Sequence, residues 1–402
     1  MRDRNNERVE RIRRSLQEQP LDLVVCALPL NVVMLSGYWP VVGTSLVIAS
    51  KDGHLGLLVP KDEEDLGQRG WADEAITFHP GSLDKITTPA EAIRGPLQDL
   101  LSKMGAAPAH IGLERDEASE PASYAAMHLY GEMLKKLLGD IFPSASLASA
   151  DDLLRQLRTL KTLDETNRIR IACGFAERAF REGKRQLRPG LTEVEAAALF
   201  RGPLSAALPD FPEVERADGF VFCMSGSNSA LASGAYARSR AKRIEAGDLV
   251  LVHCNSYADG YWTDITRTYC IGALHERQRA MYTAVFAARD AALRAISQGI
   301  KAAEIDRAAR DILSAHGFGP QFKHSTGHGI GFSAINPNAR PRLHPKSQDT
   351  VESGMVFNVE PAIYIDGYGG VRHCDMMAVT ENGAELLTPF QCRVEELLVD
   401  GQ

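Results

Sequence analysis

The stretch VLVHCNSYADGYWTDITRT, residues 250–268, has the pattern of a β-hairpin. An apolar run leads to the turn signal ADG, and a second run rich in strand-forming residues follows it. If the two-residue loop is AD, His253 lies opposite Asp264, and if it is DG, His253 lies opposite Thr266. Because side chains alternate along a strand, both registers place His253 and Asp264 on one face of the sheet. A polar pair that faces solvent is the simpler interpretation of this stretch alone.

A second hairpin is predicted in GMVFNVEPAIYIDGYGGVRHCDMMAVT, residues 354–380. An odd-numbered loop centred on Gly367 places Glu360 opposite Cys374. Glu360 lies in an otherwise apolar strand, where a carboxylate without a partner is costly. We therefore expect a metal ion or a positive group beside Glu360.

A glycine-rich segment, HSTGHGIG at residues 324–331, precedes this second hairpin. Its glycines allow the backbone and a ligand to approach closely. His328 is a candidate metal ligand, whereas His324 is expected to support the ligands rather than bind the ion itself. Five possible metal ligands thus fall on strand-like or glycine-rich segments: His253, Asp264, His328, Glu360 and Cys374. We expect them to converge on one pocket.

The length and composition indicate a globular protein with two domains. The chain has 402 residues, of which 44% are hydrophobic and 24% charged, with a formal net charge of -7. The charge and its distribution give no indication of nucleic-acid binding, and no apolar stretch is predicted to span a membrane. Seven cysteines without a CxxC pair, together with no predicted signal peptide, favour reduced thiols in the cytoplasm.

The order of expected elements predicts an α/β N-terminal domain and an α+β C-terminal domain with an antiparallel sheet. Strands are predicted at 21–27, 45–50 and 55–60, and a long helical tract begins near residue 149 and is interrupted near Thr162. Further helices are predicted at 192–207 and 276–316, with hairpin-like strands between and after them. We place the domain boundary near residue 155, which gives domains of residues 1–155 and 156–402.

Four motifs follow one another along the chain: GYWTDITRT (260–268), TGHGIG (326–331), GMVFNVEPAIY (354–364) and GYGGVR (367–372). Together they resemble the pita-bread hydrolase family, which includes methionine aminopeptidase, aminopeptidase P, prolidase and creatinase. The segment LDLVVCALPLNVVMLSGYW (21–39) is similar to the creatinase-type N-terminal domain. The resemblance implies a pita-bread C-terminal domain, a homodimer, and a hydrolase of the proline-peptidase type that cleaves a C–N bond in a small peptide or peptide-like substrate.

The resemblance also implies a set of site residues, with replacements at two positions. Peptidases of this family hold two metal ions with Asp, Asp, His, Glu and Glu, and Asp264, His328 and Glu360 match three of these ligands. His253 replaces the first aspartate, and Cys374 replaces the last glutamate. A family histidine is also missing at Ile335 and another near Ser233, although His344 is a candidate substitute for the first.

These replacements leave three functional hypotheses open. Imidazole and thiolate ligands would favour one divalent ion that is zinc-like rather than manganese-like. In a metal-independent, creatinase-like hydrolase, His253 would act as a base oriented by Asp264, with Glu360 and His324 as further catalytic residues. Cys374 as a nucleophile is a minor variant of this hypothesis. The third hypothesis is a catalytically inactive homologue that acts as a binding protein.

Overall fold

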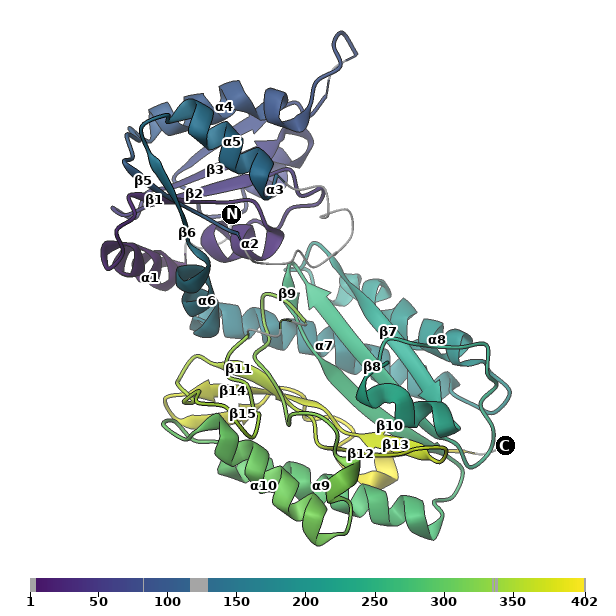
Figure 1. Ribbon diagram of the computed structural model, residues 1–402. Coiled ribbons are helices and arrows are strands. Elements are labelled where there is room, and N and C mark those ends of the chain that lie inside the picture. Colours follow the sequence, from purple (N-terminus) through teal and green to yellow (C-terminus); the bar gives the residue numbers. More distant parts are fainter. Residues whose placement is uncertain (1–4, 82, 116–128, 335, 337–338, 401–402) are drawn as a thin grey trace. The chain divides into compact units, whose positions relative to one another are not determined.

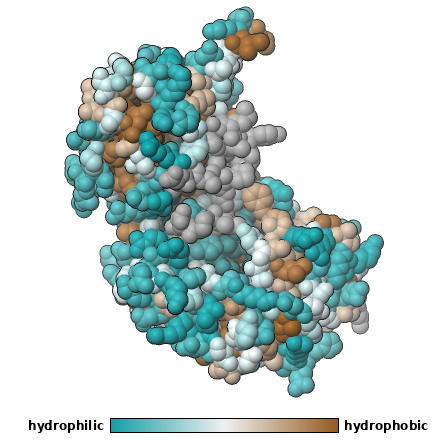
Figure 2. Space-filling view, in the orientation of Figure 1, coloured by the Kyte–Doolittle hydropathy of each residue, from teal (hydrophilic) through white to brown (hydrophobic). Residues whose placement is uncertain are grey.

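The computed structural model describes residues 5–81, 83–115, 129–334, 336 and 339–400 (Figure 1). The chain divides into two compact units, Met1–Arg158 and Thr159–Gln402. No helix in the described ranges is both long and apolar enough to cross a membrane. On the face that Figure 2 shows, hydrophilic residues predominate among those coloured, and the exposed large hydrophobic residues of the chain include Leu83, Ile86, Leu163, Val194 and Leu231.

The first unit is an α/β domain built on a six-stranded mixed sheet of order β4-β3-β2-β1-β5-β6. Its strands are β1 Leu23–Cys26, β2 Leu46–Ser50, β3 Leu55–Pro60, β4 Glu74–Phe78, β5 His110–Leu113 and β6 Ser146–Ser149. Its helices are α1 Asn6–Gln17, α2 Pro29–Ser36, α3 Glu64–Gly67, α4 Pro89–Lys103, α5 Glu132–Ile141 and α6 Asp151–Thr159. The core packs strand residues such as Val25 and Ile48 against Leu100 of α4 and Leu137 of α5. The three strands predicted for this part of the chain are present as β1, β2 and β3.

The helices of the second unit are α7 Leu163–Gln186, α8 Glu193–Ala206, α9 Glu276–Ala295 and α10 Ala302–Ala315. Thr162 caps α7: its hydroxyl accepts from the N–H of Glu165, whose carboxylate accepts from the N–H of Thr162 at 2.9 Å. This capping box is the physical cause of the predicted interruption near Thr162. The segment 276–316, predicted as helical, contains two helices that are separated around Gly299, where φ is +89°.

The strands of the second unit are β7 Ala217–Ser225, β8 Leu249–Ala258, β9 Tyr261–Trp262, β10 Ile265–Ile271, β11 Val356–Val359, β12 Ala362–Ile365, β13 Gly369–Arg372, β14 Asp375–Thr380, β15 Gly383–Leu386 and β16 Leu398–Val399. The strand pairs described in this unit are antiparallel, as predicted, except for β10 and β16, which pair in parallel. One sheet has the order β16-β10-β8-β7, with β9 paired to β8; the others are β11-β14-β15 and β12-β13. Helices α7 and α8 pack on β7 and β8, and α9 packs on β11, β12 and β13 (Figure 1).

The two hairpins have defined registers that bring their polar residues together. His253 pairs with Thr266, so the first loop is Asp259-Gly260, the second of the two predicted registers. Both loop residues have positive φ, +48° and +86°, as a type I′ turn requires. The β12–β13 pairing is centred on Gly367, as predicted for the second hairpin. An isolated bridge joins Thr266 to Cys374, so the second hairpin lies beside the first.

Candidate active site

The six side chains predicted to form the site lie together in the second unit. A cavity of about 160 Å³ is lined by five of them, His253, Asp264, His324, His328 and Glu360. The sixth, Cys374, lies directly beside this cavity. One donor atom from each of Asp264, Glu360 and Cys374 lies within 4.8 Å of the other two. All three side chains are buried.

Asp264 is at the centre of the group because β8 and β10 present it on the same face as His253. Its Oδ1 is 3.5 Å from Nδ1 of His253 and its Oδ2 is 3.7 Å from Nε2 of His328. Nδ1 of His328 lies 3.2 Å from the carbonyl oxygen of Gly329, to which it can donate. That tautomer leaves a lone pair on Nε2, which faces the carboxylate of Asp264 and can also accept from Nδ2 of Asn358 at 3.5 Å. These two acceptors, Nε2 and the carboxylate, face each other at a distance at which a cation bound between them would stabilise the arrangement.

Cys374 brings a thiol into this polar group. Its Sγ is 3.1 Å from the carbonyl oxygen of Asp264, and Nδ2 of Asn358 is 3.6 Å from it. Burial, together with the carboxylates of Asp264 and Glu360, raises the pKa of the thiol well above its usual range. A nearby cation is therefore needed to hold Cys374 as a thiolate, the form that ligates a metal.

The donor set fits one divalent cation. Asp264, Glu360 and a thiolate at Cys374 supply three negative charges, which one divalent ion and the guanidinium of Arg372 balance. His328 supplies an imidazole lone pair and Cys374 a sulfur atom. Imidazole and sulfur ligands favour Zn²⁺ over Mn²⁺, which prefers carboxylate oxygens.

Arg372 is the main residue of the site that the sequence did not identify. It lines the cavity and its guanidinium donates to Oγ1 of Thr266 and to Nδ1 of His253, both at 3.0 Å. Because a guanidinium has no acceptor, Nδ1 of His253 must accept, and the ring proton lies on Nε2. Nε2 of His253 is buried and makes no hydrogen bond with the described residues.

His253 is neutral in this environment. Burial, to which the charge of Arg372 adds, lowers the pKa of His253 to about 4 despite the neighbouring Asp264. Its Nδ1 lone pair is directed to Arg372 rather than to the centre of the donor group. As arranged, His253 is therefore better placed to hold Arg372 than to ligate a metal ion or to act as a base.

His324 is fixed in the cavity wall by hydrogen bonds to both ring nitrogens. Nδ1 lies 2.7 Å from the carbonyl oxygen of Ser325, and Nε2 lies 3.0 Å from the hydroxyl of Tyr364. Burial, together with Arg372, lowers the pKa of His324 to about 4. The ring is therefore neutral, with Nδ1 donating and Nε2 accepting.

The irregular segment after β7 also contributes to the cavity. Ala232, Ser233 and Tyr236 line it, and the ring of Tyr236 lies edge-on to His253 with 5.3 Å between ring centroids. The sequence identified the neighbourhood of Ser233 but not Tyr236, because no hairpin periodicity extends into this segment. Ile335, the other position where a family histidine is missing, lies outside the described residues.

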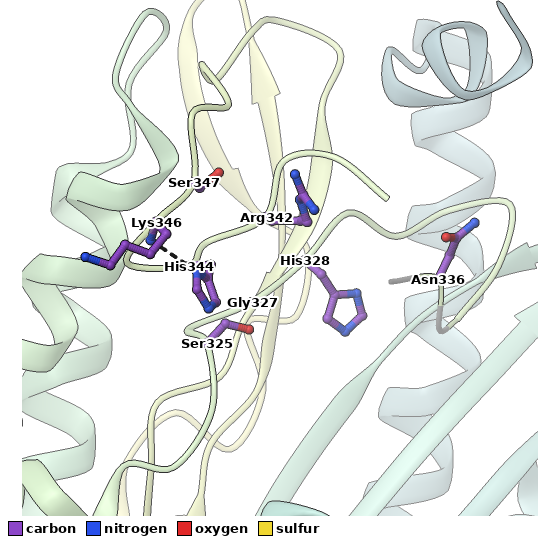
Figure 3. Close-up of a pocket in the computed structure, with 8 residues that line it drawn as sticks. All are labelled: Ser325, Gly327, His328, Asn336, Arg342, His344, Lys346 and Ser347. Carbon is purple, nitrogen blue, oxygen red and sulfur yellow. Dashed lines mark hydrogen bonds between the residues drawn. The ribbon is translucent and has the colours of Figure 1, made fainter. Parts of the chain in front are cut away.

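A second cavity, of about 540 Å³, adjoins the first and shares Ser325 and His328 with it (Figure 3). It is lined by the cations Arg342 and Lys346 and by the imidazole rings of His328 and His344, and none of its described lining residues is acidic. His344 thus lies in this neighbouring cavity and not among the residues that line the smaller one. The second cavity is suited to an anionic group.

A second group of potential ligands, His373, Asp375 and Cys392, does not have the character of a metal site. Arg267 donates to Oδ1 of Asp375 at 2.8 Å, and Arg289 donates to Oδ2 at 2.5 Å. Burial opposes ionisation, but the two guanidinium groups and His373 hold the pKa of Asp375 well below its usual range. A cation beside two buried guanidinium groups would be repelled, so we interpret this group as a structural ion network.

The chain is similar to known proteins over almost its whole length. The model of metallopeptidase family M24 matches residues 167–381, and that of the creatinase/prolidase N-terminal domain matches residues 8–160. The Xaa-Pro dipeptidase of Pyrococcus furiosus is 29% identical over 382 residues, 95% of this chain and 97% of the relative. The crystal structure of the prolidase from Pyrococcus horikoshii OT3 matches with a TM-score of 0.76 and 26% identity, over 97% of this chain and 100% of that one. An Xaa-Pro dipeptidase from Bacillus anthracis matches with a TM-score of 0.78 and 25% identity, over 98% and 99%.

Proposed function

The chain belongs to metallopeptidase family M24, and from this premise we propose that it cleaves Xaa-Pro dipeptides with a site altered to hold one soft divalent ion. The pita-bread fold, the creatinase-type N-terminal domain and the proline-peptidase class of hydrolase expected from the sequence are confirmed. The observation that carries the proposal is the lone pair of His328 Nε2 that faces Asp264, with Glu360 and Cys374 beside them.

Asp264, His328, Glu360 and Cys374 are the proposed ligands of the ion, which we expect to be Zn²⁺ rather than Mn²⁺. When bound, such an ion lowers the pKa of a water molecule and polarises a carbonyl group. One ion per chain follows from the two carboxylates and one thiolate in the donor group, because one divalent ion and buried Arg372 already balance their charge.

The reaction needs a group that moves protons, and Glu360 is placed for this role. In hydrolysis, the oxygen of water forms a bond to the carbonyl carbon, and the π pair of the carbonyl moves to its oxygen. The electron pair on that oxygen then re-forms the C=O bond as the C–N bond breaks. The leaving nitrogen keeps the electron pair of the C–N bond and takes up a proton. We propose that Glu360, which lines the cavity, accepts a proton from water and delivers it to the leaving nitrogen. His324, fixed by its two hydrogen bonds, would form the wall against which the substrate rests.

The basic cavity supports a substrate that ends in a carboxylate. A dipeptide with its scissile carbonyl beside Asp264 and Glu360 would direct its C-terminal carboxylate out of the smaller cavity. The larger cavity begins there, at Ser325 and His328, and carries Arg342. A guanidinium pairs well with a carboxylate, so we propose that Arg342 helps to select short peptides.

The creatinase-like alternative is less well supported. In that alternative His253 acts as a base, so it needs a free lone pair that faces the substrate. The lone pair of Nδ1 instead accepts a hydrogen bond from Arg372 at 3.0 Å. We also propose a homodimer in the cytoplasm. The family resemblance supports the dimer, and seven cysteines without a disulfide support a reducing compartment.

Metal analysis of protein purified without chelator tests the proposal, together with hydrolysis of Xaa-Pro dipeptides in the presence of Zn²⁺, Mn²⁺ or Co²⁺. We expect close to one zinc per chain and hydrolysis that a chelator abolishes. Activity that survives the chelator would favour the creatinase-like alternative. Absence of both metal and hydrolysis would favour a binding protein.

A further inference from the structure

Arg372 is a buried cation at the catalytic cavity without a close carboxylate. Only 4% of the residue is exposed. Its nearest carboxylate oxygen among the described residues, Oε2 of Glu360, is 3.9 Å from Nη1. Its closer acceptors are neutral: Oγ1 of Thr266 and Nδ1 of His253 at 3.0 Å, and the hydroxyl of Tyr364 at 3.5 Å.

Arg267, on the neighbouring strand β10, gives a direct comparison because it is also fully buried. Its guanidinium donates to a carboxylate oxygen of Asp375 at 2.8 Å. It also donates to the carbonyl oxygens of Cys374 at 2.7 Å and Phe390 at 3.0 Å. Removing a guanidinium from water costs several kcal/mol, and close anionic partners offset that cost. Arg267 has such a partner, whereas Arg372 has only a distant one.

The cavity beside Arg372 is where an anion forms during peptide hydrolysis. When water adds to the scissile carbonyl carbon, the π pair moves to the carbonyl oxygen and gives it a full negative charge. A preorganised cation at this oxygen stabilises the charge most strongly where water is excluded. Arg372 lines the same small cavity as Glu360, to which we assign the proton transfer.

We infer that the guanidinium of Arg372 contacts the oxygen of the scissile carbonyl and stabilises the oxyanion, with His253 as its positioning residue. This inference rests on the proposed function. His253 accepts from Nη2 and Thr266 accepts from Nε, so two of the three guanidinium nitrogens are fixed. The third nitrogen, Nη1, has only the longer contacts to Tyr364 and Glu360. It is the nitrogen that a substrate oxygen can approach.

The test compares Arg372→Lys with Arg342→Ala and with the exposed control Arg277→Lys. Kinetics of Xaa-Pro dipeptide hydrolysis give kcat and KM, and calorimetry gives the Kd of a phosphinate isostere of the dipeptide and of the product proline. For Arg372→Lys we expect kcat to fall by ~10²–10³ with KM changed by less than ~3-fold, as for loss of an oxyanion donor. The phosphinate should bind more weakly by a similar factor, and proline equally well. Arg342→Ala should instead raise KM, and Arg277→Lys should change neither.

A second pair of variants covers the case in which Arg372→Lys does not fold. His253→Leu removes the acceptor for Nη2, whereas His253→Asn keeps an acceptor atom near the position of Nδ1. We expect His253→Leu to lower kcat and His253→Asn to recover most of that loss.

Three results would overturn the inference. The first is an Arg372→Lys variant with unchanged kcat, whatever its KM, because the arginine would then contribute at most to binding of the ground state. The second is equal loss in both His253 variants. The third is a wild-type protein that neither hydrolyses the peptides nor binds the phosphinate, which would overturn the proposed function as well. Normal hydrolysis by Arg372→Lys would overturn only the inference.

Discussion

Replacing His253 by aspartate should raise the affinity for Mn²⁺ and lower the stability of the metal-free protein, because it buries a new charge. A carboxylate oxygen at the position of Nδ1 would lie 3.0 Å from Nη2 of Arg372 and 3.5 Å from Oδ1 of Asp264. With an effective dielectric constant of 20, the attraction is ~5.5 kcal/mol and the repulsion ~4.7 kcal/mol. The two nearly cancel, so the cost of removing the new carboxylate from water, which is several kcal/mol, determines the change in metal-free stability.

The metal-bound protein should gain from the replacement. The aspartate adds a charged oxygen that can bind the ion, whereas the Nδ1 lone pair of His253 is directed to Arg372. A gain of only ~1.4 kcal/mol in binding free energy would tighten Mn²⁺ binding about tenfold. The same carboxylate would pair with Arg372 and reduce its effect on the oxyanion. We therefore expect Zn²⁺-supported kcat to fall while Mn²⁺ affinity rises.

Calorimetric titration of metal-free protein with Mn²⁺ and Zn²⁺ measures the affinities, and thermal unfolding without metal measures the stability. His253→Asn is the matched control, because it has a similar size to aspartate but no charge. Unchanged Mn²⁺ affinity in His253→Asp would refute the reasoning. So would an unchanged metal-free stability, since the removal of the new carboxylate from water should lower it by several kcal/mol.

Three further predictions follow from the site and its surroundings. Cys374→Ser should abolish the sulfur-to-metal charge-transfer band of the cobalt-substituted protein, whereas Cys254→Ser should keep it; a band that survives in Cys374→Ser would place the sulfur ligand elsewhere. Asp349→Asn should raise KM for Xaa-Pro dipeptides with little change in kcat, because Asp349 accepts from the backbone N–H of Arg342 at 2.9 Å; an equal loss in kcat would contradict this role. Asp375→Asn should lower the free energy of unfolding in urea by ~3–5 kcal/mol at pH 7, because it removes the carboxylate from buried Arg267 and leaves Arg289 with only that of Asp290. Since the folded-state pKa of Asp375 is depressed, the wild-type contribution should be complete above about pH 4 and lost only as the pH falls through the folded-state pKa; a variant as stable as the wild type would show that the network contributes little.

Much of the site was predictable because it depends on strand periodicity. Alternation along β8 and β10 places His253 and Asp264 on one face, and the centre of the second hairpin at Gly367 places Glu360 and Cys374 opposite each other. These relations hold for any hairpin of that register, so they could be read from spacing.

The role of Arg372 could not be predicted in this way. Its contacts depend on the bridge between Thr266 and Cys374, which joins segments more than a hundred positions apart in the sequence. The tautomer of His253 likewise depends on which group lies within 3.0 Å of Nδ1. The sequence left two registers open for the first hairpin, because both loops contain turn-forming residues, and the observed pairing of Ala258 with Tyr261 decides between them.

The tight turn at Asp259-Gly260 also limits how this active site can evolve. Insertion of a single residue in β8 or in the turn would shift the pairing by one position and move Asp264 to the opposite face of the sheet. Substitution carries no such penalty, because each strand position keeps its direction whatever side chain it holds. In a protein with this fold, the residue at position 253 can therefore change between aspartate and histidine, and that at position 374 between glutamate and cysteine, one position at a time. The remaining ligands stay in place. Metal preference is open to gradual change here, whereas the loop length is not.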